Sequence, residues 1–254
     1  EYPQAKTMDI ADTRVFYLSD HELPLVDLTL LVKAGSVDVD DSRIGLAALL
    51  TDSIIRGGTE TRSPAELARV LDENAIHLSV AVGEEEAVIR LSVLKDDWQS
   101  GLAILQEILT RPAFDAGVLD VVKTQQLTEL KRQGGNAQAV AGRERDIWYF
   151  KGHPYGRDPL AGLQSIPLIG REDLKQFLRD YFVPSNMVAA IAGDIDQEDV
   201  TAGLSQFFAA LPQTRAPQRN LADPAETSPV LALIHKPGQV QSQIVLSLPS
   251  VKRT

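Results

Sequence analysis

The sequence contains no cysteine, which excludes disulfide bonds, thiolate metal sites and a cysteine nucleophile. Positive charge is also scarce, since 25 basic residues against 35 acidic ones give a formal net charge of -10. This balance disfavours nucleic acid and anionic membranes as partners. No apolar run approaches the roughly 20 residues of a membrane-spanning helix, and the opening residues EYPQ are not a signal peptide. We therefore expect a globular protein that neither inserts into a membrane nor binds nucleic acid.

Histidine is rare as well. The four histidines are His21, His77, His153 and His235, and none lies three or four residues from another. That spacing is needed to place two imidazoles on one helix face, so a helical pair of metal ligands is excluded. The sequence also lacks a G-x-S-x-G elbow, and its glycine pairs do not form a phosphate-loop pattern. Serine-hydrolase and nucleotide-binding motifs are therefore not indicated.

Alternating apolar and polar residues predict four strands in the first hundred residues. Residues 13–18 and 25–33 are joined by a turn-rich segment and predict an antiparallel pair. Residues 76–82 and 88–94 flank Gly83 and predict a second hairpin. A fifth, short buried strand is predicted at residues 187–192.

Helical spacing of apolar residues predicts several helices. The segment SPAE at residues 63–66 is a capping box with proline at the first helical position, and it starts a helix that reaches about Asn74. Asp115 is expected to cap a long helix that ends at Gly134 and Gly135. Further helices are predicted at residues 98–109, 137–150, 171–182 and 197–210. Trp98 and Trp148 fall among apolar neighbours in these helices and are expected in the core.

The C-terminal part has a different composition. Four prolines lie within residues 212–229, which predicts an extended linker between a domain at residues 1–211 and the start of another at residues 230–254. Residues 230–234 and 243–248 alone look like strands there, and two strands bury too little surface for a core. We therefore expect the chain to be a fragment that stops just inside a second domain.

Residues 43–59, RIGLAALLTDSIIRGGT, predict a buried helix that Ser42 caps and that ends at Gly57 and Gly58. Helical spacing places Ala48 and Asp52 on one face, one turn apart, with Thr51 beside them.

This stretch resembles the H-x-x-E-H helix of the pitrilysin and insulinase type of zinc peptidases, the inverzincins. That family includes mitochondrial processing peptidase and bacterial two-subunit peptidases. On this resemblance the two histidine positions hold Ala48 and Asp52, and the glutamate position holds Thr51. Four later segments also resemble family motifs in the same order, namely GHPYG at 152–156, YFVPSNM at 181–187, AGDI at 192–195 and KPGQVQS at 236–242.

The resemblance implies an α+β fold, in which helices pack on one face of a mostly antiparallel sheet, followed by the start of a second similar domain. It implies that a working enzyme is two chains or two halves closed around a chamber. The third zinc ligand of the family is a glutamate on a later helix, and Glu129 occupies that position. A peptide substrate adds to an edge strand, which corresponds here to Ile76, His77, Leu78, Ser79, Val80, Ala81 and Val82. The asparagine of that strand in the family falls on Leu78.

The residues at the catalytic positions do not suit zinc chemistry. A peptidase zinc needs three protein ligands, an open position for water and a nearby carboxylate base. Ala48 has no donor atom, and Thr51 cannot act as a general base near neutral pH. Asp52 and Glu129 would supply only two carboxylates from different helices. We therefore expect no catalytic residue, no metal and no cofactor in this chain, with zinc present only in a catalytic partner.

Three hypotheses follow. The first is a non-catalytic subunit of a heteromeric zinc metallopeptidase, which closes the chamber, binds a homologous zinc-containing partner and helps to hold a peptide. The second is a stand-alone peptide-binding or scaffold protein. The third, with the least support, is an active zinc metalloendopeptidase with an unrecognised site. Bacterial relatives of the two-component kind are exported, so the resemblance implies a periplasmic or otherwise exported protein.

Overall fold

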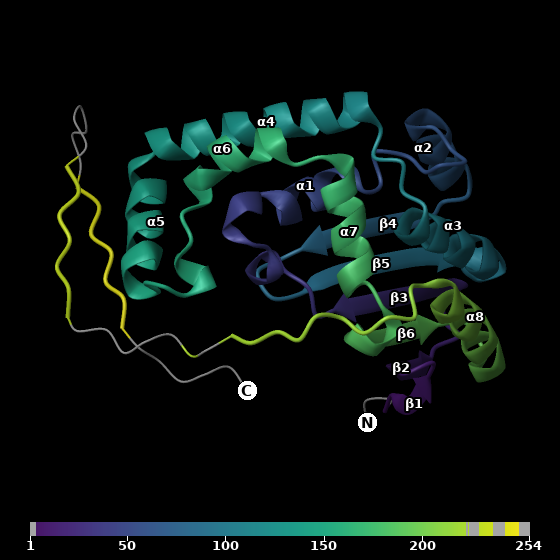
Figure 1. Ribbon diagram of the computed structural model, residues 1–254. Helices are drawn as coiled ribbons and strands as arrows, with labels where there is room; N and C mark the ends of the chain where they lie inside the picture. The colour runs from purple at the N-terminus through teal and green to yellow at the C-terminus, as the bar shows by residue number, and fades with distance from the viewer. Residues whose placement is uncertain (1–3, 222, 224–228, 236–241, 249–254) are drawn as a thin grey trace.

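The computed structural model describes residues 4–221, 223, 229–235 and 242–248 (Figure 1). Its strands form one mixed sheet in the order β1-β2-β6-β3-β5-β4. Neighbouring strands are antiparallel except for β2 and β6, which are parallel. The strands are β1 (Lys6–Ile10), β2 (Thr13–Ser19), β3 (Leu25–Val32), β4 (His77–Val82), β5 (Ala87–Leu94) and β6 (Met187–Gly193).

The predicted antiparallel pairing of residues 13–18 with residues 25–33, which form β2 and β3, is wrong. β6 lies between β2 and β3, with Val15 opposite Ala189 on one side and Leu30 opposite Ala189 on the other. The connection at residues 20–24 is not a two-residue turn of the kind that fixes a hairpin, so β2 and β3 are free to accept a strand from far along the chain. The predicted β4–β5 hairpin is confirmed, while β1 was not indicated by the sequence.

Most predicted helices are confirmed. Ser63 and Glu66 form the predicted capping box of α2, and the Asp115 side chain accepts a hydrogen bond from the Val118 amide at the start of α4. The helices are α1 (Leu46–Ser53), α2 (Pro64–Glu73), α3 (Trp98–Thr110), α4 (Ala116–Gly135), α5 (Ala137–Tyr149), α6 (Gly162–Ser165), α7 (Arg171–Tyr181) and α8 (Gln197–Ala210). Trp98 is buried as expected, but Trp148 is 48% exposed because α5 lies away from the sheet (Figure 1).

The two faces of the sheet differ in exposure. Alternate residues of the central strands, such as Val15, Leu30 and Ile89, are completely buried beneath the helices. Their neighbours on the opposite face are accessible, and Phe16 and Leu31 are 39% and 37% exposed. Because side chains alternate between the faces of a sheet, this pattern shows that helices cover one face only. The expected α+β fold with a mostly antiparallel sheet is confirmed.

The motif helix α1 is shorter than predicted. It begins at Leu46, because Gly45 has a φ of +99° and breaks the helical path from Arg43. Asp40, rather than Ser42, provides a cap, and it caps the 3₁₀ turn of residues 41–43. Gly58 has a φ of +68° in the turn that follows α1, as expected for a residue that reverses the chain.

The turn after α1 is fastened to α3 by Glu107, which is 8% exposed. The Glu107 carboxylate accepts hydrogen bonds from the hydroxyls of Thr59 and Thr61 and forms an ion pair with Arg62. Thr59 also forms a β-bridge with Pro112, directly after α3. These contacts set the position of the C-terminal end of α1 relative to the sheet.

The C-terminal segments are not organised as predicted. Within the described residues, 229–235 and 242–248 belong to no strand, and Leu231 and Ile244 are 99% and 93% exposed. A strand needs a neighbouring strand for its backbone hydrogen bonds, and these segments have none in the described part of the chain. Most of the predicted KPGQVQS motif lies outside the described residues. The division into two domains and a linker therefore stays a prediction.

Candidate functional site

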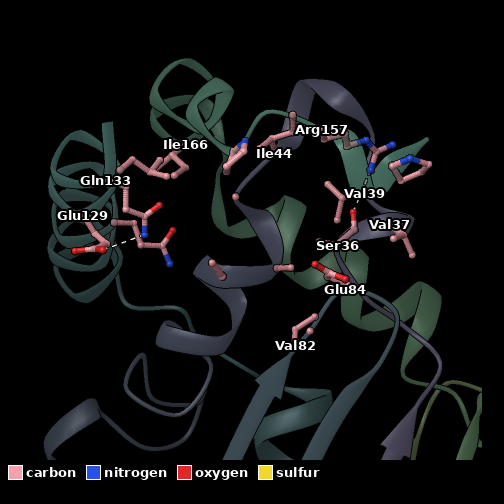
Figure 2. A pocket seen from close by; sticks show the side chains of 18 of the residues that line it. Ser36, Val37, Val39, Ile44, Val82, Glu84, Glu129, Gln133, Arg157 and Ile166 are labelled. Carbon is pink, nitrogen blue, oxygen red and sulfur yellow. Dashed lines mark hydrogen bonds between the residues drawn. The ribbon is translucent and has the colours of Figure 1, made fainter. Parts of the chain in front are cut away.

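A cavity of about 770 Å³ opens between α1, α4, the β4–β5 turn and the segment before α7. Figure 2 shows Glu129 and Gln133 on one side of this cavity and Ser36, Val82 and Glu84 on the opposite side. Ala48, Asp52 and Glu129, which the sequence placed at metal-ligand positions, all line it. The fold therefore brings Ala48, Asp52 and Glu129 to one cavity, whereas Thr51 is not among the residues that line it.

The side of the cavity formed by α1 presents one methyl group and one carboxylate. Ala48 is exposed toward the cavity and presents only a methyl group. One turn later, the Asp52 carboxylate accepts a hydrogen bond of 3.0 Å from the Gln126 side-chain amide. Asp52 is thus paired with a neutral amide from α4 rather than with a second metal ligand.

Glu129 is neutralised within its own helix. Its carboxylate accepts hydrogen bonds from Arg132 Nε at 2.7 Å, Arg132 Nη2 at 2.6 Å and Gln133 Nε2 at 3.0 Å. The bonds from Arg132, followed by that from Gln133, lower the pKa of Glu129 to about 2. Glu129 is therefore ionised near neutral pH and already has a cation as its partner.

These side chains do not fit a peptidase zinc. Ala48 provides no ligand, Asp52 and Glu129 have separate partners on α4, and Thr51 carries no carboxylate. Among the described residues, no group of three or more His, Cys, Asp or Glu is arranged to hold a metal ion. The α1 positions therefore supply neither the two histidines nor the glutamate that a zinc of this kind would need there.

Thr51, at the position of the family's general base, makes a structural contact. Its Oγ1 accepts a hydrogen bond of 2.9 Å from the Val82 amide and donates one of 3.1 Å to the Ala47 carbonyl. The Thr51 hydroxyl thus ties α1 to the end of β4. Nothing in the sequence pattern indicated this bond, because Thr51 and Val82 are 31 positions apart.

We expect Thr51→Val to loosen this junction. The variant keeps the shape of the side chain but leaves the Val82 amide without its acceptor, so stability should fall by about 1 kcal/mol. Hydrogen exchange of the Val82 amide should accelerate. Thr124→Val is the matched control, because the Thr124 hydroxyl bonds only to Asp120 within α4. Unchanged exchange at Val82 in Thr51→Val would show that the bond does not hold β4.

Strand β4 is a free edge in the described structure, where it pairs only with β5. The Gly83 amide points toward the β5 side, to the Glu86 carbonyl, whereas the Val82 amide points away, to Thr51. Backbone groups alternate along a strand, so the N–H and C=O groups of Leu78 and Val80 also point away from β5. These groups could pair with an added strand. The predicted peptide-binding strand therefore has backbone groups that point away from β5, and peptide binding itself stays a prediction.

The segment GHPYG forms an ordered loop at the cavity. His153 Nδ1 accepts a hydrogen bond from the Tyr155 amide at 3.2 Å, and the two rings are 4.5 Å apart. The Tyr155 hydroxyl bonds to the Glu85 carboxylate in the β4–β5 turn. His153 thus orders a loop, as its sequence context suggested, while Pro154 and Tyr155 line the cavity.

A second polar cluster was missed by the sequence analysis. His21 Nε2 is 2.8 Å from Ser19 Oγ, and His21 Nδ1 is 2.5 Å from Asp194 Oδ1. This order of atoms matches a serine-hydrolase triad. However, none of the three residues lines the cavity between α1 and α4, and Lys95 also bonds Asp194. His21 and Lys95 lower the pKa of Asp194, and we assign the cluster to anchoring the β2–β3 connection.

Comparison with known proteins places these features in a family. The family model "Insulinase (Peptidase family M16)" matches residues 14–158, and the model "Peptidase M16 inactive domain" matches residues 169–254. The chain is 28% identical over 206 residues to "Non-peptidase homolog YmxG" of Helicobacter pylori, covering 81% of this chain and 48% of that protein. It is 26% identical over 198 residues to "Probable mitochondrial-processing peptidase subunit beta" of Schizosaccharomyces pombe, covering 78% and 43%.

Solved structures agree with this placement. The peptidase M16 inactive domain from Pseudomonas fluorescens superimposes with a TM-score of 0.80 at 27% identity, covering 87% of this chain and 54% of that one. The first half of the Escherichia coli periplasmic protease PqqL shares the fold, with a TM-score of 0.73 at 20% identity and coverage of 89% and 51%. The chain spans about half the length of the curated relatives that it matches. Within the described residues, the helices are too short or too polar to cross a membrane.

A family model covers more than half of the chain, and the fold agrees with that of a solved M16 domain. The matched range contains helix α1, whose Ala48, Thr51 and Asp52 the resemblance assigns to the positions of the H-x-x-E-H motif. The protein belongs to peptidase family M16.

Proposed function

We propose that this chain is a non-catalytic M16 subunit that closes a peptidase chamber with a homologous zinc-containing partner. The observation that carries the proposal is a cavity lined by α1 and α4, combined with residues at positions 48, 51 and 52 that do not suit zinc chemistry. The match to an inactive-domain model and to a relative named as a non-peptidase homolog supports a non-catalytic member. A relative named as a subunit of mitochondrial processing peptidase supports assembly with another chain.

The peptide-holding part of the proposal depends on β4. Its outward backbone groups lie beside the cavity, since Val82 at the end of the strand is one of the residues that line it. Pairing with an added strand uses main-chain hydrogen bonds and needs no zinc. The edge can therefore hold a peptide after the catalytic residues are lost, and it would present that peptide to the partner's zinc.

The full-length protein, produced with a zinc-motif homologue from the same organism, tests the proposal. We expect the two chains to elute as one complex that cleaves peptides, whereas this chain alone shows no chelator-sensitive cleavage. Recovery of the chain from its native host without any zinc-motif homologue, but with bound peptide, would favour the stand-alone peptide-binding protein instead. Chelator-sensitive cleavage by this chain alone would favour an active enzyme and overturn the proposal.

A proline variant of β4 tests the peptide edge. Leu78→Pro removes an N–H that points away from β5, so the β4–β5 ladder keeps its bonds while an added strand loses one. We expect peptide affinity of the complex to fall about tenfold, the cost of one or two lost backbone bonds. Leu78→Val is the control, because it keeps the N–H. Equal peptide affinity in both variants would place the peptide elsewhere.

Export to the periplasm is part of the same proposal. It is supported by the resemblance to exported two-component peptidases and by a fold shared with a periplasmic protease. Cell fractionation of the native host checks it, and recovery of the protein in the cytoplasmic fraction would remove this part.

A further inference from the structure

The segment after α8 is tied to the domain at two points, although it has no helix or strand. Near its start, the Gln213 side-chain amide donates hydrogen bonds to the Phe208 carbonyl at 2.8 Å and the Leu211 carbonyl at 2.7 Å. Six residues later, the Arg219 side chain is only 9% exposed. We call residues 212–221 the strap. Between its two attachments, Arg215 and its neighbours line a cavity of about 570 Å³ that separates the strap from the domain.

Arg219 makes the stronger attachment. Its Nε donates to Asp38 Oδ1 at 2.9 Å, and its Nη2 donates to Asp38 Oδ2 and, at 2.6 Å, to the Glu85 carbonyl. The Asp38 side chain is 4% exposed and also accepts a hydrogen bond from the Gly35 amide. A bidentate, buried arginine–carboxylate pair is both strong and geometrically specific. Removal of one partner leaves the other charge buried and unpaired.

The two groups that Arg219 binds lie in two turns whose other residues, Ser36, Val37, Gly83 and Glu84, line the larger cavity; we call these turns the rim. Asp38 ends the 3₁₀ turn η1 (Ser36–Asp38), and Glu85 lies in the β4–β5 turn. The two turns are joined by hydrogen bonds from the Ser36 amide to the Gly83 carbonyl and from the Val37 amide to the Glu84 carbonyl. A Cβ at Gly35 would lie 2.0 Å from the Glu84 carbonyl oxygen, so the backbones pack in direct contact. The turns therefore move together.

We propose that Arg219 is a positioning residue. Through Asp38 and the Glu85 carbonyl, this residue of the strap holds the rim and the end of β4 in place. This inference rests on the proposed function, because β4 is the strand that would hold the peptide. Displacement of the strap would loosen the rim and weaken the peptide edge. By thermodynamic linkage, a bound peptide would hold the strap more firmly in return.

Limited trypsin digestion of the full-length chain tests the strap without any peptide. Arg215 is exposed on the strap, whereas Arg219 is held against Asp38, so the two arginines report on the same segment. We expect cleavage after Arg215 to be at least tenfold faster than cleavage after Arg219. In Asp38→Asn, cleavage after Arg219 should rise about tenfold while cleavage after Arg215 stays constant. Equal rates at both arginines in the unmodified protein would overturn the inference.

Hydrogen exchange shows whether the strap holds the rim. Arg219→Lys keeps the positive charge but loses the bidentate contact with Asp38. It should therefore increase the rate of amide exchange in residues 83–86. Arg215→Lys is the matched control and should leave exchange there unchanged. Identical exchange in the two variants would remove the positioning role, even if trypsin shows Arg219 to be held.

Peptide affinity separates this inference from the proposed function. If the complex binds peptide, Arg219→Lys should weaken binding several-fold and Arg215→Lys should not. If substitution of Arg219 changes exchange at the rim but the unmodified complex binds no peptide, the positioning role is supported and the peptide-holding function is wrong. If peptide binds and is insensitive to Arg219, the function stands and the positioning role fails.

Discussion

The triple variant A48H/T51E/D52H is expected to bind one zinc ion per chain. Positions 48 and 52 are one helical turn apart on the cavity wall, which is the spacing that lets two histidines share a zinc. Glu129 lines the same cavity on α4 and would supply the third ligand. Elemental analysis after dialysis against trace zinc gives the stoichiometry, with the unmodified chain measured in parallel.

Two further substitutions test whether Glu129 is the third ligand of the new site. Glu129 must leave Arg132 and Gln133 to reach the metal, so adding Arg132→Ala to the triple variant should tighten zinc binding. Adding Glu129→Gln should weaken zinc binding at least tenfold. Loss of a residue that only hydrogen-bonds to a metal ligand typically costs about tenfold or more in metal affinity, and Glu129 would contact the metal directly. A triple variant that folds normally by circular dichroism but retains no zinc would show that these positions do not converge. Stoichiometric zinc in the unmodified chain would show that the assignment of the degenerate motif is wrong.

Glu107→Ala is expected to lower stability by about 2–3 kcal/mol, because it leaves the buried Thr59 hydroxyl without its acceptor and the partly exposed Arg62 without its carboxylate partner. The substitution leaves Arg62 and the hydroxyls of Thr59 and Thr61 without their shared acceptor. It also frees the turn that positions the end of α1. Urea unfolding followed by circular dichroism measures the change in the free energy of unfolding.

Two control variants separate burial from charge. Glu73→Ala removes an exposed carboxylate that pairs with Arg69 within α2, and such pairs contribute about 0.5 kcal/mol or less. Glu107→Gln keeps an acceptor for one hydroxyl. Its loss in the free energy of unfolding should lie between the losses in Glu73→Ala and Glu107→Ala. A loss below about 1 kcal/mol in Glu107→Ala, well under the expected range, would mean that water replaces the carboxylate.

Local signals in the sequence predicted local structure well. The capping box at Ser63 and Glu66 and the cap at Asp115 act within four residues, so the start of each helix can be read from its own segment. The start of α1 was placed too early because its boundary depends on the backbone conformation of Gly45. The exposure of Trp148 was missed because helical spacing describes a face and does not reveal whether another element covers it.

Long-range partners could not be derived in the same way. Helical spacing placed Ala48 and Asp52 on one face, and the family resemblance assigned the motif positions, but neither indicated what those side chains contact. The bond between Thr51 and Val82 and that between Asp52 and Gln126 depend on how α1 meets β4 and α4. Arg219 looked like one more residue of a proline-containing linker, and only its contact with Asp38 distinguishes it.

The position of β6 also constrains the order of events during synthesis. β2 and β3 are complete by Val32, yet the strand that joins them begins at Met187. Before that strand is available, the native strand order allows only two separate partial sheets, β1–β2 and β3–β5–β4, each with an unpaired inner edge. Such edges pair readily with other chains, and contacts so distant in sequence form slowly. The sheet can therefore be completed only after Gly193 has been translated, and unpaired strand edges favour aggregation until then.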